Sequence, residues 1–202
     1  PIQSVLDGMP RRNMTFSMRG SYGFKDRYFI EGSFGYNGSE RFADKNRMGF
    51  FPAGGIAWVI SSEPFMQSTS EWLPFLKFRA SYGKVGNDGI ISTPRFVFLP
   101  LIEKPNSLQY KDPMPYGQNI NRFRVSSYAN ENIKWEIAEQ VNLGLEAKLF
   151  KGVVEFTLDA FQEVRHNILA NRTTIPSSMG VELAPLDNIG KARTRGFDFS
   201  GK

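Results

Sequence analysis

Cysteine is absent from the 202 residues, which excludes disulfides, thiolate catalysis and cysteine metal sites from this chain. Histidine occurs only at position 166, so a Ser-His-Asp catalytic set could form only around His166. No run of 18 apolar residues occurs and the mean hydropathy is -0.34, so we expect no transmembrane helix. Transmembrane β-strands would escape the same test.

The charge distribution gives no sign of a nucleic-acid partner. The 25 Lys and Arg residues are dispersed among 20 acidic residues without a basic block, which is typical of an ordinary solvated surface. The first ten residues, PIQSVLDGMP, have neither the basic start nor the apolar centre of a signal peptide. Either the protein stays where it is made, or the chain is an internal piece of a longer one.

The residues that are present favour β structure. Aromatic residues make up 14% of the chain, and 19 Gly and 12 Pro indicate strands and turns. In residues 76–82, apolar and polar side chains alternate strictly before the chain enters Gly-Lys-Val-Gly-Asn-Asp-Gly. Alternation at period two predicts a strand with one apolar and one polar face, and the glycines with Asn and Asp predict its exit into a loop.

The same alternation recurs along the chain and predicts about seven strands of about ten residues each, a length that crosses a hydrocarbon layer when tilted by about 45°. It begins at residues 13, 28, 51, 76, 140, 154 and 197. Charged side chains would then share the polar faces, where they suit a wet barrel interior, while the opposite faces suit lipid. These charged residues are Glu31, Lys77, Arg79, Glu146, Lys148, Glu155 and Asp159.

The predicted connections also alternate in length. Tight or modest links follow the first, third and fifth strands, whereas polar loops at residues 38–47, 83–128 and 166–188 follow the second, fourth and sixth. We therefore predict an all-β fold: an antiparallel transmembrane β-barrel segment with short periplasmic turns and long extracellular loops. A single alternating strand is more typical of a soluble antiparallel sheet with one solvated face, and it is the repeated strand length and the sorting of the loops that favour the barrel.

Four ordered blocks of sequence resemble one known family. They are FFPAGGIAWVISSEPF at residues 50–65, LKFRASYGKVGNDGI at 76–90, KWEIAEQVNLGLEAKLF at 134–150 and DNIGKARTRGFDF at 187–199. They resemble conserved blocks of the SusC/RagA-type TonB-linked outer-membrane transporters. The resemblance implies a 22-stranded barrel filled by an N-terminal plug, a SusD-like surface lipoprotein as partner, and import of glycans or peptides with energy relayed by TonB.

The chain departs from this family in length, because neither a plug nor enough strands to close a barrel is present. We therefore expect residues 1–202 to form part of one TonB-dependent receptor β-barrel domain in the bacterial outer membrane, in contact with lipid. TonB would act through the absent N-terminal part. The alternatives are a soluble all-β carbohydrate-binding module and, third, a secreted β-rich enzyme.

The excursion at residues 83–128 holds the candidate contact residues. Its aromatic residues could stack on sugar rings, meet a capping lipoprotein or simply anchor their own loop, and nearby polar side chains could hydrogen-bond a ligand. The candidates for substrate or partner contact are Asn87, Arg95, Phe96, Gln109, Tyr110 and Tyr116.

We expect neither catalysis nor a cofactor. His166 stands between Arg165 and Asn167 at a predicted strand end, which favours a solvated loop residue. Asp88 is the only acidic residue of Gly-Asn-Asp-Gly at 86–89, too few for a calcium cage, so no metal site is predicted.

Overall fold

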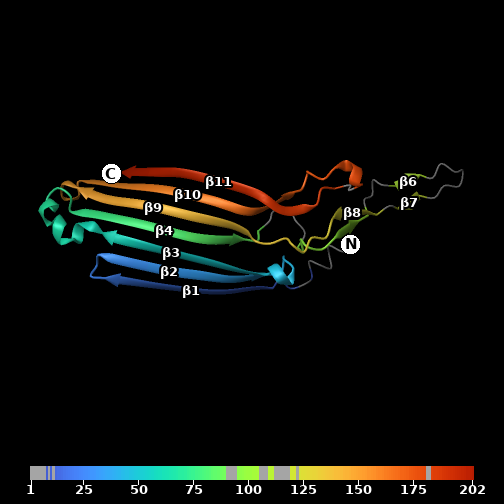
Figure 1. The fold of residues 1–202 in the computed structure, drawn as a ribbon, viewed down its shortest axis with the longest axis horizontal. Helices are drawn as coiled ribbons and strands as arrows, with labels where there is room; N and C mark the ends of the chain where they lie inside the picture. Colours follow the sequence, from blue (N-terminus) through green and yellow to red (C-terminus); the bar gives the residue numbers. More distant parts are fainter. Residues whose placement is uncertain are drawn as a thin grey trace.

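The computed structural model describes residues 8, 10, 12–89, 95–104, 109–111, 119–121, 123–180 and 183–202. Seven long strands form one sheet in the order β1-β2-β3-β4-β9-β10-β11, and each pair of neighbours is antiparallel (Figure 1). Their bounds are β1 (Asn13–Phe24), β2 (Tyr28–Ser39), β3 (Met48–Val59), β4 (Phe75–Asn87), β9 (Glu136–Leu149), β10 (Val154–Asn171) and β11 (Leu186–Gly201).

The remaining elements are short and lie in the connections. Between β4 and β9, β5 (Leu101–Glu103) pairs with β8 (Arg124–Ser127), and β6 (Gln109–Lys111) pairs with β7 (Asn119–Asn121). Short 3-10 helices occupy other links: η1 (Asp44–Asn46), η2 (Ile60–Ser62), η3 (Pro64–Thr69), η4 (Phe150–Gly152) and η5 (Ser177–Met179).

The connections gather at two ends of the sheet (Figure 1). The turn end holds the β1–β2, β3–β4 and β9–β10 links, and the loop end holds those of β2–β3, β4–β9 and β10–β11. In the β1–β2 turn, Lys25 and Asp26 have φ of 53° and 55°, the positive values that a tight hairpin turn requires at both positions. The turn-end link at residues 60–74 is longer than the loop-end link at 40–47, so length alone does not separate the ends.

The sheet has two chemically different faces, set by strand register. One register row, at the turn end, aligns side chains that are all apolar: Phe24, Tyr28, Trp58, Phe78, Leu145, Leu158 and Phe199. We call the surface on this side the apolar face. The adjoining row lies one residue nearer the loop end on each strand and points to the opposite side, which we call the polar face. It contains Gly23, Phe29, Ala57, Arg79, Gly144, Asp159 and Asp198.

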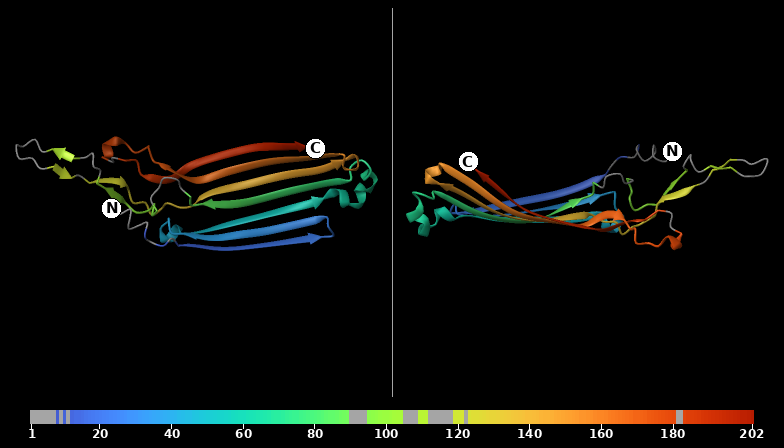
Figure 2. Two further views of the ribbon diagram at one scale, coloured as in Figure 1. Left: turned by 180° about the vertical axis from the view of Figure 1, so that it is seen from behind. Right: turned by 90° about the horizontal axis from the view of Figure 1, so that it is seen from above.

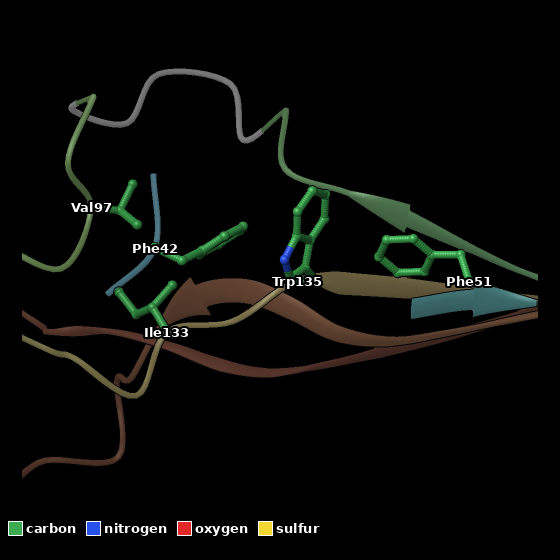
Figure 3. Close-up of a cluster of buried hydrophobic side chains, with 5 residues drawn as sticks. All are labelled: Phe42, Phe51, Val97, Ile133 and Trp135. Carbon is green, nitrogen blue, oxygen red and sulfur yellow. The ribbon is translucent and has the colours of Figure 1, made fainter. Parts of the chain in front are cut away.

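Within the described residues, no second layer covers either face of the sheet (Figure 2). Large apolar side chains are therefore exposed along the apolar face, among them Phe16 at 58% and Ile56 at 56%. The buried cluster is small and lies at the loop end (Figure 3); it comprises Phe42, Phe51, Val97, Ile133 and Trp135. An apolar surface this extensive indicates lipid or another protein against it.

The seven antiparallel strands confirm the predicted fold class. No helix in the described part of the chain is long and apolar enough to cross a membrane. Two predicted boundaries were wrong: β4 continues to Asn87, and the last loop is 172–185 rather than 166–188. Beyond Ala160 the apolar face carries polar side chains such as Gln162 and Arg195, so apolar alternation fades there although backbone pairing continues, as between Val164 and Arg193.

Candidate functional site: the polar face and the loop end of the sheet

Ion pairs join three neighbouring strands across the polar face. The Arg79 Nη2 atom of β4 lies 2.8 Å from both carboxylate oxygens of Asp159 on β10, and Arg79 Nε lies 3.4 Å from a carboxylate oxygen of Glu146. Gly144 of β9 stands between Arg79 and Asp159 in the register. A Cβ atom at position 144 would lie 2.2 Å from Arg79 Nε, so only glycine lets the guanidinium cross β9.

A second polar cluster lies nearer the loop end of the same face. Gln140 Nε2 donates to Glu163 at 2.7 Å, and Arg165 pairs with both Glu163 and Glu136. Asn87, the last residue of β4, stands opposite Glu136 in the register. The polar face therefore presents carboxylates, amides and a guanidinium where the sheet meets its loops.

Between these charged groups the polar face is hollowed. A depression of about 820 Å³ spans β1 to β9 and is lined mainly by residues of this face. Small side chains form much of its lining, which leaves room for other atoms against the backbone: Ser21, Ser33, Ala53, Gly55, Ala57, Ser81 and Gly83.

The loop end is built around the buried cluster, which Figure 3 shows. Phe42 comes from the β2–β3 loop and Phe51 from β3. Val97 comes from the excursion, and Ile133 and Trp135 come from the segment that joins the excursion to β9. The Trp135 ring packs against Phe42 and Phe51, with centroids 5.2 and 5.3 Å away. This cluster fixes the base of the excursion onto the sheet.

Hydrogen bonds reinforce the same attachment. Asn188 of β11 accepts from the backbone N–H of Lys134 at 2.8 Å and donates to the Lys134 carbonyl at 3.0 Å. The Asn46 amide donates to the carbonyl of Ile133 at 3.2 Å. The β2–β3 link, the β4–β9 link and the start of β11, which are distant in sequence, are thus held together at one end of the sheet.

The structure separates the sequence-predicted contact residues into groups. Asn87 is exposed on the polar face, and its side-chain oxygen accepts from the Gly89 N–H at 2.9 Å. Arg95 is largely buried in an ion pair with Glu40, donates to the Pro10 carbonyl at 2.7 Å, and stacks over the Phe96 ring. Arg95 therefore ties the excursion to the β2–β3 loop.

The other three candidates belong to the far part of the excursion. Gln109 and Tyr110 lie in β6, opposite Asn121 and Ile120 of β7. Tyr116 lies outside the described residues. β6 and β7 stand away from the main sheet (Figure 1), so the structure does not bring Gln109 and Tyr110 together with Asn87.

Sequence reasoning missed the cluster of Gln140, Glu163 and Arg165. These residues occupy alternate positions along β9 and β10, in step with the other polar-face residues. That alternation was the only feature of the sequence that could have placed them on this face. His166 lies on the opposite side from Arg165, 3.8 Å from Glu139. In the described ranges, no three His, Asp or Glu side chains gather closely enough to hold a metal ion.

The apolar face forms a band that slants across the strands. In β1 the band runs from Met14 to Phe24, and in β10 it runs from Val154 to Ala160. Ala160, the loop-end limit of the band in β10, lies in the same register row as Tyr22, which is near the turn end of β1. The band thus moves toward the turn end from β1 to β10. Tilted strands in a level membrane produce this slant, at about 1.5 residues per strand for a 45° tilt.

One sheet with a slanting apolar face and a charged polar face is the wall of a transmembrane β-barrel. The sequence profile described as "TonB dependent receptor-like, beta-barrel" matches residues 9–202. The chain belongs to this family of outer-membrane receptors, which confirms the predicted family and location.

Individual relatives agree. TonB-dependent receptor P26 of Formosa agariphila is 32% identical over 92% of this chain and 18% of its own length, and TonB-dependent receptor SusC of Bacteroides thetaiotaomicron is 30% identical over 89% and 17%. The RagAB peptide importer in the "open-open" state superposes with a TM-score of 0.76 and 25% identity, over 94% of this chain and 19% of that chain. The chain thus spans about a fifth of these relatives or less, and none of the three is named as an enzyme or a soluble binding module.

Proposed function

We propose that residues 1–202 are part of one β-barrel domain of a TonB-dependent importer that takes up glycans or peptides. The observation that supports this most directly is the pairing of an uncovered apolar face with a polar face that carries ion pairs from β4 to β10. Lipid suits the first face and a hydrated passage suits the second. The peptide class comes from the name of the RagAB peptide importer, and the glycan class comes from the resemblance to the SusC/RagA-type transporters.

The partners follow from the same proposal. A SusD-like surface lipoprotein would meet the loop end, since the anchored excursion rises from that end of the sheet (Figure 1). TonB would supply energy through parts of the receptor that lie outside this chain. The wall itself would have no catalytic role.

Within this proposal the candidate contact residues have different tasks. Asn87 would face the passage at its mouth, beside Glu136. Arg95 and Phe96 would fix the base of the excursion, because Arg95 is bound to Glu40 and stacked on Phe96. Gln109, Tyr110 and Tyr116 would touch substrate or lipoprotein.

A loop replacement in the intact receptor tests this division. Glu103 of β5 stands opposite Arg124 of β8, so residues 104–123 can be replaced by Asn-Gly as a two-residue hairpin turn. The buried cluster at the base, including Val97 and Ile133, is left in place. We expect a folded barrel with at least tenfold lower uptake or lipoprotein binding, since the loss of two or three contacts of about 1 kcal/mol each has this effect.

The matched control replaces residues 104–123 by a Gly/Ser linker of the same length, which keeps the chain length and removes the side chains. Both variants should lose uptake to a similar degree. Normal uptake and normal lipoprotein capture in the Asn-Gly variant would contradict a contact role for Gln109, Tyr110 and Tyr116. Offering peptides and glycans as sole nutrients to cells with the unaltered receptor decides between the two substrate classes.

A further inference from the structure

Three cations form a row on β11 where its apolar face gives way to polar residues. Phe199 and Phe197 lie on the apolar face opposite Leu158 and Ala160, and the β10–β11 register continues without a shift from there to Ala192. Side chains at alternate positions share a face, so the residues that follow on the apolar side are Arg195, Arg193 and Lys191. Successive members stand about 6.6 Å apart along the strand.

Within the described residues this row has no carboxylate partner. Arg195 Nε donates to the neutral amide oxygen of Gln162 at 2.7 Å, and Arg193 stands opposite Val164. The nearest acidic residue on the same face, Glu139, is paired with Lys84 at 2.8 Å and lies 3.8 Å from His166. All three cations are exposed, so among the described residues the row is a positive strip without a carboxylate partner.

The depth of the row in the membrane determines what it can meet. The row lies between the apolar band of β11 and the loop end, which is the extracellular side in this family of barrels. A charge that faces hydrocarbon is costly, but long Lys and Arg side chains reach the headgroup level. The strongest complement for guanidinium at that level is a phosphate group.

We propose that Lys191, Arg193 and Arg195 form a binding site for the phosphate groups of a glycolipid in the outer leaflet of the membrane. Arg193 and Arg195 hold the phosphate through charge-assisted hydrogen bonds, and Gln162 orients the Arg195 guanidinium through its bond to Nε. The acyl chains of the same lipid lie along Phe197 and Phe199. This site is independent of substrate import, because it faces away from the polar face.

Lipid binding to the intact receptor in mild detergent tests the site. Native mass spectrometry or a melting-temperature shift is measured with a diphosphorylated glycolipid and with the same lipid after removal of its phosphates. We expect tighter binding of the phosphorylated lipid, and about thirtyfold weaker binding of it by the R193Q/R195Q double variant, since each basic side chain near an anionic surface contributes about fivefold.

The control is K25Q/K151Q, which removes the same charge from the two tight turns at the opposite end of the sheet and should leave the affinity unchanged. Equal binding of both lipids, or an equal loss in the control variant, would overturn the proposal. So would a double variant that melts earlier than the unaltered receptor in lipid-free detergent, because the row would then be paired within the barrel.

Discussion

Gly144 shows how one residue on β9 permits a contact between its two neighbours. Arg79 and Asp159 come from strands that are not adjacent, and they meet only because position 144 has no side chain. The sequence gives Gly144 no distinction from other strand glycines. Only the register, which depends on pairing across distant segments, reveals its role.

Gly144→Val should therefore separate Arg79 from Asp159. We expect the substitution to lower the free energy of unfolding by about 1–3 kcal/mol, as overpacking typically does. Thermal melting of the intact receptor in detergent measures the effect. Gly20→Val is the matched control, because a Cβ at position 20 meets no atom within 4 Å; a similar loss in both variants would contradict the account.

Glu63 is a buried carboxylate at the turn end. It accepts hydrogen bonds from the Tyr28 hydroxyl at 2.5 Å and from the Trp58 indole at 3.0 Å, and Arg27 lies 3.4 Å away. These donors, the Tyr28 hydroxyl first, hold the pKa of Glu63 below its ordinary value. The carboxylate thus links the β3–β4 connection to β2.

A lowered pKa means that the ionised form stabilises the folded protein at neutral pH, and that this contribution is lost as pH falls through the folded pKa. Glu63→Gln should melt at a lower temperature than the unaltered receptor at about pH 7, and the gap should narrow toward about pH 3. Melting curves at several pH values measure this. A gap that stays constant with pH would show that the charge of Glu63 is unimportant.

At the scale of elements, the strands were predictable because alternation is local. The sheet and the faces of β1 to β4 and β9 follow from period-two patterns. The ends of β10 and β11 were not predictable, because Gln162 and Arg195 remove the apolar signal. The attachment of the excursion was not predictable either, since Val97 and Ile133 meet Phe42 across long sequence separations without any periodicity.

Neighbouring positions on β9 test the assignment of the two faces. Leu143 is 46% exposed on the apolar face, whereas Asn142 lies on the polar face. In the intact receptor, Leu143→Arg should cost about 2–4 kcal/mol near the membrane midplane, and Asn142→Arg should cost much less. Folded yield in detergent compares the two variants, and equal losses would be inconsistent with a lipid-facing Leu143.

At the scale of the whole molecule, the sheet accounts for location but not for substrate. Its apolar face, slanting band and two unlike ends fit a membrane wall, and the family assignment agrees. Substrate choice could not be predicted from the sequence, because the candidate contact residues lie in three separate places. Asn87 is at a strand end, Arg95 is in the anchored base of the excursion, and Gln109 is in a distant hairpin. No local sequence pattern predicts which of these parts contacts a ligand.

Labelling from outside the cell tests the central claim, that the sheet crosses the outer membrane with its loop end outside. Asp44 in the β2–β3 loop and Lys151 in the β9–β10 turn are exposed at opposite ends of the sheet, and this chain has no cysteine. In a cysteine-free intact receptor, Asp44→Cys should react with an impermeant thiol reagent on whole cells. Lys151→Cys should react only after the outer membrane is breached; labelling of Lys151→Cys on intact cells would contradict the account.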